Sequence, residues 1–432
     1  MRLAPLALAL VACASKPEGT IQLVTGGEAD TMTRDPVPTS LLVEAVDSSG
    51  KATQLAKVSW PAASIDLGEQ SQDTVAQLRV TGLDATGTAR VRGMSVPVQL
   101  GGLAGTTLDV FVQRAGEFAR LPAPLSDARQ KPLVASVLDR YLLVAGGADA
   151  SLGTKPQLYD FATYTPASSP PTLTRAPLSL AMHASAALLI DAAGATWFEL
   201  ADNSHADPST PTGGSFAEIA GGATVAADDG SAYVVGGTRA GDASARVLKI
   251  ATDGTLSFIA LTVPRKGAAA AWVKGRGLVI VGGSATGAGV EVIAAGATSS
   301  TALPFPSDAT TGAGAVALDD KAVLLAGGVD AMGADAKLRV VDLSCSASCA
   351  PNVWSTALPA PLVRARAFAL GDGSALVVGD DATGATHATR VSQTAIADAP
   401  IKAARSGATA IFGPTGFIAI AGGAGVIETF VP

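Results

Sequence analysis

Arginines recur at a fixed place before pairs of glycines, and they are the residues of this sequence best suited to bind a ligand. Three of them precede the first glycine of a pair by one constant interval, and the others lie at or near the corresponding place: Arg129, Arg265 and Arg405, then Arg175, Arg364 and Arg366. A guanidinium group binds carboxylates through paired hydrogen bonds. If these side chains converge, they can hold an anion. The alternative is that each arginine donates hydrogen bonds to backbone carbonyls around it.

Histidine and aspartate offer less. His183, His205 and His387 are too far apart in the sequence to form a metal-ligand motif. The pairs Asp228-Asp229 and Asp319-Asp320 precede apolar runs and are typical of hairpin turns. A third pair, Asp380-Asp381, is more open to a functional interpretation because Asp380 stands where a glycine is expected. No G-x-S-x-G nucleophile motif is present. We predict no catalytic residue, no metal and no cofactor.

The cysteines suggest an exported protein. Met1-Arg2 and the apolar run that follows have the form of a secretory signal, residues 1–15, too short to span a membrane. Its end, Leu10-Val11-Ala12-Cys13, resembles the bacterial lipobox, which implies a lipid anchor on Cys13. By resemblance to proteobacterial lipoproteins, Ala14 after the cysteine implies an outer-membrane or surface location. The alternative is cleavage after Ala14, giving a periplasmic or secreted protein.

Cys345 and Cys349 lie in a long connection between two repeats. In an exported chain we expect them to form a disulfide, and metal binding by the pair is the alternative.

The glycine pairs repeat with a nearly constant period. They begin at residues 146, 236, 282, 327 and 422, with Gly379-Asp380 in another copy. The interval from 146 to 236 is twice the usual one of roughly 45 residues, so a degenerate copy is expected between them, at residues 188–194. A full repeat contains segments for four strands. Four strands at this period predict a seven-bladed β-propeller over residues 115–432.

These repeats resemble the kelch family. The resemblance rests on the double glycine after the second strand, on Leu158-Tyr159-Asp160, and on the segment from Trp354-Ser355-Thr356 to Arg366. It implies that the connections carrying the arginines reach the face around the central channel, where they would form a ring.

The last repeat has no fourth strand of its own. The segment Glu117-Phe118-Ala119-Arg120-Leu121-Pro122 resembles the outer strands and is expected to complete it. A chain beginning at Ala115 should therefore fold as a monomer, and one beginning at Arg129 should aggregate.

Residues 16–114 have a different pattern. Six or seven short alternating segments, separated by turns such as Asp47-Ser48-Ser49-Gly50, predict an antiparallel β-sandwich of immunoglobulin-like type. It carries no chemical motif, and we expect it to hold the propeller away from a membrane.

Charge and composition narrow the partners. The net charge is −7 and no basic block is present, which argues against nucleic acid. The best-supported function is a non-catalytic, monomeric binding module for a protein or a glycan. Two alternatives stay open: a propeller enzyme acting on extracellular polysaccharide, and a purely structural envelope protein.

Overall fold

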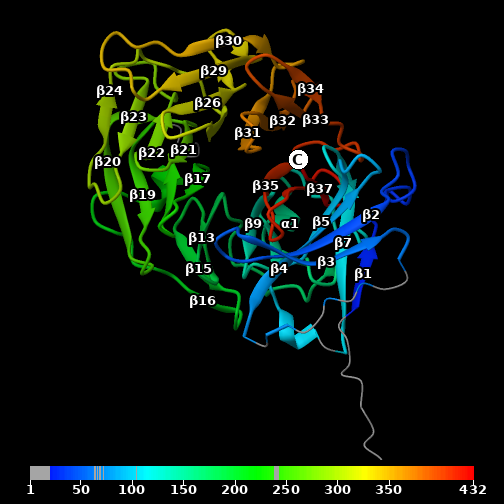
Figure 1. Cartoon of the computed structure of the whole chain (residues 1–432). Coiled ribbons are helices and arrows are strands. Elements are labelled where there is room, and N and C mark those ends of the chain that lie inside the picture. The colour runs from blue at the N-terminus through cyan, green and yellow to red at the C-terminus, as the bar shows by residue number, and fades with distance from the viewer. Residues whose placement is uncertain are drawn as a thin grey trace, which may run out of the picture.

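The computed structural model describes residues 20–432 except 63, 64, 66, 68, 69, 72, 104 and 238–242. Cys13 and the predicted signal lie outside the described residues. Most regular structure in the described chain is β-strand, and seven four-stranded antiparallel sheets form a closed ring, a seven-bladed β-propeller (Figure 1). At six of the seven blade junctions, the first strands of neighbouring blades pack against each other, so these strands line the centre of the ring. Each successive strand of a blade lies further out.

The blades follow the sequence repeats, including the degenerate second copy. Blade 1 contains β9 (Leu133–Val137), β10 (Tyr141–Ala145), β11 (Gln157–Asp160) and β12 (Thr165–Pro166). Blade 2 contains β13 (Ser179–His183), β14 (Ala186–Ile190), β15 (Ala195–Glu199) and β16 (Ser204–Ala206). Blade 3 contains β17 (Ala223–Ala226), β18 (Ala232–Val235), β19 (Ser244–Ile250) and β20 (Leu256–Arg265). Blade 4 contains β21 (Ala269–Val273), β22 (Gly277–Val281), β23 (Val290–Ile293) and β24 (Thr301–Leu303).

Blade 5 contains β25 (Gly314–Ala317), β26 (Ala322–Ala326), β29 (Lys337–Asp342) and β30 (Asn352–Ala357). Blade 6 contains β31 (Val363–Ala369), β32 (Ala375–Asp380), β33 (Thr386–Val391) and β34 (Ile396–Asp398). Blade 5 also carries a small hairpin, β27 (Val329–Asp330) and β28 (Gly333–Ala334). Two short helices lie between strands, α1 (Ala150–Gly153) and α2 (Phe216–Ile219).

The second strand of each blade is the centre of its core. Strands such as β22 are apolar at almost every position and buried on both faces, because a neighbouring blade covers each face. The glycines that follow allow the chain to leave this crowded region. Gly282 has a φ of +75°, and a Cβ there would lie 2.6 Å from the carbonyl oxygen of Thr310. The glycine pair is therefore a requirement of the scaffold.

The ring closes with a strand from the far end of the repeat region. Blade 7 contains β35 (Thr409–Phe412), β36 (Ile418–Ala421) and β37 (Glu428–Phe430), and its outer strand is β8 (Phe118–Arg120). Phe118 pairs with Phe430, and their rings lie 5.1 Å apart between centroids. The closing strand is the one that the sequence indicates.

The N-terminal strands form one sheet, and the expected immunoglobulin-like sandwich is not confirmed. The elements are β1 (Thr20–Val24), β2 (Ser40–Val46), β3 (Ala52–Ser59), β4 (Val75–Leu83), β5 (Ala89–Met94), β6 (Val98–Gln99), the 3₁₀ turn η1 (Leu100–Leu103) and β7 (Thr107–Arg114). Their order is β1-β7-β5-β4-β2-β3, and β6 pairs with β4. The buried face is covered by loop residues such as Met32 and Leu67. Alternation in the sequence shows that one face is buried, but not whether a sheet or loops cover it.

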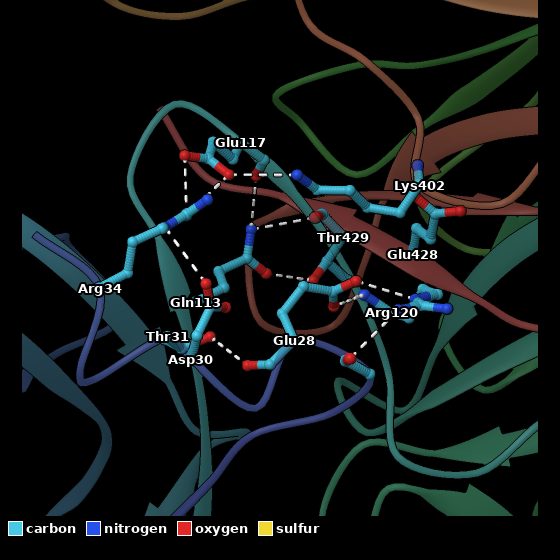
Figure 2. Close-up of polar contacts among 11 residues, drawn as sticks. Glu28, Asp30, Thr31, Arg34, Gln113, Glu117, Arg120, Lys402, Glu428 and Thr429 are labelled. Atoms are coloured by element: carbon cyan, nitrogen blue, oxygen red, sulfur yellow. Dashed lines mark hydrogen bonds and ion pairs between the residues drawn. The ribbon is translucent and has the colours of Figure 1, made fainter.

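This sheet packs directly against the ring. Phe111 of β7 belongs to the same apolar core as Leu121, Tyr159 and Tyr164 of the propeller. Beside this core, Glu117 forms ion pairs with Arg34 at 2.9 Å and with Lys402 at 3.2 Å (Figure 2). The contact joins three parts of the chain that are distant in sequence.

In the described part of the chain, no helix has the length and apolar character needed to cross a bilayer.

Candidate functional site: arginines on one face of the propeller

The arginines predicted to form a ring fall into two groups, and the first group is buried. The side chain of Arg265, with none of its surface exposed, forms an ion pair with Glu291 at 2.9 Å. Its Nη1 donates to the carbonyl oxygen of Gly282 at 2.6 Å. Burial by itself would raise the pKa of Glu291, but hydrogen bonds from Ser300 and Thr262, together with the charge of Arg265, lower that pKa overall. The pair is internal and joins the outer strand of blade 3 to blade 4.

Arg129 and Arg405 repeat this arrangement. Their Nη1 atoms donate to the carbonyl oxygens of Gly146 and Gly422, each at 3.3 Å. Their counter-ions are Asp127 at 2.7 Å and Glu428 at 2.6 Å. The constant interval along the sequence thus places a guanidinium on the carbonyl of the first glycine that follows it, in the next blade core. These three arginines have no free donor surface to offer a ligand, and the ring of six converging arginines does not form.

Arg175 and Arg364 form the second group, and both reach solvent. Arg175 pairs with Asp191 at 2.6 Å and Arg364 with Asp380 at 2.5 Å, with 40% and 35% of the arginine side chains exposed. In these two blades an aspartate stands where the other blades have a glycine of the pair. Both pairs lie at the end of the blade where the second strand leaves the core, so they share one face of the ring. We call this face the glycine face.

The Arg175 pair in blade 2 borders a small surface hollow. Its lining includes Asp191, Thr196 and His205, with Leu189 and Pro177. His205 packs edge-on against Phe198, with 4.9 Å between the ring centroids.

The Arg364 pair in blade 6 lies in an irregular part of the innermost strand. The pairing of β31 with β32 shifts register between Val363 and Arg366, and Arg364 has a φ of +51°. A bulge of this kind redirects the side chains beside it. Asp380 also accepts a hydrogen bond from Thr386 at 2.7 Å, which fixes the carboxylate that Arg364 contacts.

Arg366 differs from every other arginine predicted for the ring. Its side chain is exposed, and within the described structure it makes no hydrogen bond or ion pair. Burial among surrounding protein lowers the pKa of its guanidinium, and the positive charge of Arg364 lowers it further. Arg366 lies on the innermost strand of its blade. An exposed side chain at such a position is surrounded by protein and still reaches water at the centre of the ring.

The remaining candidates have structural roles or isolated positions. Cys345 and Cys349 form a disulfide between β29 and β30, and Cys349 is buried in an apolar core. His387 contacts Asp381 at 2.8 Å on the surface. Asp229 accepts hydrogen bonds from Ser231, as expected for a turn residue. Among the described residues, no group of three or more His, Cys, Asp or Glu is placed to hold a metal ion.

Two features of the polar network were not predicted from the sequence. Gln113 donates to the carbonyl oxygens of Glu117 and Thr429, at 3.0 and 2.9 Å, and so bridges the N-terminal sheet to blade 7 (Figure 2). Glu28 binds both the backbone N–H and the side chain of Arg120. Neither contact leaves a local signal, because each joins segments without a shared motif.

Comparison with known proteins shows no family. No protein family profile and no curated protein matches this chain. One chain of the solved "Crystal Structure of Mitotic Checkpoint Complex" is similar, with 9% sequence identity and a TM-score of 0.49 over 73% of this chain and 94% of that chain. A likeness this weak says nothing of function, and the propeller assignment rests on the blades themselves.

Proposed function

We propose that this protein is an exported, non-catalytic binding module of kelch type that recognises a partner protein or glycan through the glycine face of its propeller. The observation that carries the proposal is the pair of solvent-facing Arg–Asp contacts, Arg175 with Asp191 and Arg364 with Asp380. They occur where the scaffold pattern is broken, and they leave partly exposed guanidinium groups on one face. Exposed arginines are frequent anchors in protein interfaces.

Two further observations support the kelch type. Tyr159, from the motif Leu158-Tyr159-Asp160, is fully buried and donates a hydrogen bond to the carbonyl oxygen of Tyr164 at 2.7 Å. Trp354 is 9% exposed and packs in the core of blades 5 and 6. Both motif residues therefore fill blade interiors, as the repeat pattern requires.

A binding experiment tests the proposal. The soluble protein from Lys16 onward is applied to a glycan array and used to capture surface proteins. A specific partner should be retained by the parent and lost from the double variant Arg175→Glu/Arg364→Glu, because charge reversal repels an acidic or hydrogen-bond-accepting partner. Arg390→Glu is the matched control: Arg390 is 38% exposed and pairs with Asp372 at the opposite end of blade 6.

Three results would contradict the proposal. Equal partner binding by the parent and the double variant would show that the glycine face is not the binding surface. Loss of binding in Arg390→Glu alone would place the surface on the other face. Turnover of any glycan by the parent would show that the protein is an enzyme.

A further inference from the structure

The centre of the ring carries an unbalanced positive charge. Seven strands line it, β9, β13, β17, β21, β25, β31 and β35. Their sequences contain no aspartate, glutamate or lysine, and their two arginines, Arg364 and Arg366, both belong to β31. The other positions are mostly alanine, valine and leucine. A guanidinium among such walls is poorly solvated and lacks an opposite charge from the strands around it.

Charge counting assigns one net positive charge to this place. Asp380 neutralises Arg364 at 2.5 Å, and Thr386 holds that carboxylate in position. Arg366 has no such partner in the described structure. The local balance of the two arginines and Asp380 is therefore +1. A single carboxylate matches that charge, whereas a dianionic phosphate exceeds it.

The side chains of the seven innermost strands favour a carboxylate attached to an apolar group. Three of the polar side chains on these strands are already bonded inside the protein: Ser179 accepts from Gly221 N–H, Thr224 donates to Leu180 O, and Thr409 donates to Pro132 O. They offer few hydrogen bonds to sugar hydroxyls. Ala223, at the level of Arg366 in its strand, is small and partly exposed, so the wall there is apolar and not bulky.

We propose that the centre of the propeller is a receptor for one carboxylate carried on a slender apolar stem, with Arg366 as its anchor. Arg366 lies on the innermost strand of its blade with its side chain exposed, and the bulge at Arg364 shifts it from the regular register of the blade. The inference deepens the proposed function, on which it rests: the ligand is the apolar, carboxylate-bearing end of a partner that docks on the glycine face. Such a ligand favours a protein partner over a glycan.

The test uses small probes in place of the partner. Isothermal titration calorimetry of the full soluble chain is performed with octanoate, octanamide, inorganic phosphate, and an N-acetylated apolar tetrapeptide with a free or an amidated C-terminus. Octanoate and the free peptide should bind, and their uncharged counterparts should bind at least tenfold more weakly, as expected for a charge-assisted hydrogen bond. Tighter binding of the peptide than of octanoate identifies a protein terminus as the source, and the reverse identifies a fatty acid.

The variants link binding to Arg366. Arg366→Gln should weaken carboxylate binding at least tenfold, Arg366→Lys should give an intermediate affinity because it keeps the charge and loses the planar fork, and Arg390→Gln should match the parent. Circular dichroism melting checks that all variants are folded. Absence of carboxylate binding, equal affinity in Arg366→Gln and the parent, or tighter binding of phosphate overturns the proposal. Because no partner is present, failure here is distinct from failure of the proposed function.

Discussion

At the scale of the residue, the neighbour of an arginine decides its role. In blades 1, 4 and 7 the guanidinium meets the carbonyl of an intact glycine pair and is buried. In blades 2 and 6 the arginine before the second strand pairs instead with Asp191 or Asp380 and stays half-exposed. In these two blades the carboxylates are buried, with Asp191 7% and Asp380 3% exposed, and it is the arginine side chains that reach water.

Replacing a buried arginine should destabilise the protein strongly. Arg265→Ala leaves the buried carboxylate of Glu291 without its partner, and the expected loss in free energy of unfolding is about 3–5 kcal/mol. Urea denaturation followed by tryptophan fluorescence measures it. Arg390→Ala removes an exposed pair and should cost no more than about 1 kcal/mol. A loss in Arg265→Ala as small as in this control would contradict the assignment.

The same pair predicts a dependence on acid. The pKa of Glu291 is lower in the folded chain than its ordinary value of 4.5, so its contribution to stability is complete above that value and is lost as the pH falls through the lower, folded pKa. Between about pH 5 and about pH 3, the urea midpoint of the parent should fall more steeply than that of Glu291→Gln, which has no carboxylate to protonate. Parallel slopes would rule out this contribution.

The sequence located these arginines but could not separate the two groups. Their constant interval before the glycines is visible in the chain, yet the carboxylates that neutralise Arg265 and Arg405, Glu291 and Glu428, come from the third strand of the blade that follows each arginine. Only the folded blade brings them together. The sequence places Arg366 near the predicted site. That it has no ion-pair partner depends on the absence of acidic residues from the six other innermost strands, which only the fold identifies.

At the scale of the element, periodic features were predictable and packing partners were not. The period gave seven blades, the hidden second copy and the closing strand, because each blade repeats one local pattern. The N-terminal strands were recognised as strands, but their alternation fits equally a sandwich and a single sheet covered by loops. Residues such as Ile65 and Leu67, which cover the buried face, lie in a segment without a strand pattern.

The closing strand should be essential for the ring. Phe118→Ala removes a side chain that is 1% exposed and packs on Phe430, so we expect a loss of about 3–5 kcal/mol and aggregation through the freed edge of β37. Phe412→Ala is the matched control, because Phe412 belongs to the same blade and is 51% exposed. Urea denaturation and size-exclusion chromatography measure both effects. Equal behaviour of the two variants would show that β8 is dispensable.

At the scale of the whole molecule, the N-terminal sheet is part of the closure of the ring. The backbone N–H of Phe111 donates to the hydroxyl of Tyr164 in blade 1 at 2.9 Å, and Gln113 bonds to blade 7. Arg92 donates to the carbonyl oxygen of Pro432 at 2.7 Å. The sheet thus holds both sides of the junction at which the ring begins and ends. A chain beginning at Ala115 would lose these contacts, so we now expect it to be less stable than the full chain.

The sheet and the ring should therefore unfold together. Differential scanning calorimetry of the full soluble chain is expected to show one transition whose calorimetric and van't Hoff enthalpies agree. Tyr164→Phe leaves the buried N–H of Phe111 without an acceptor and should lower the stability of that single transition by about 1–3 kcal/mol. Val75→Ala, at a position of the same sheet that is 59% exposed, should leave it unchanged. Two separate transitions, with only one displaced by Tyr164→Phe, would mean that the sheet is an independent spacer. A single shared transition would mean that the N-terminal sheet and the ring form one cooperative unit. A partner bound at the centre of the ring would then be supported by the N-terminal sheet as well as by the blades.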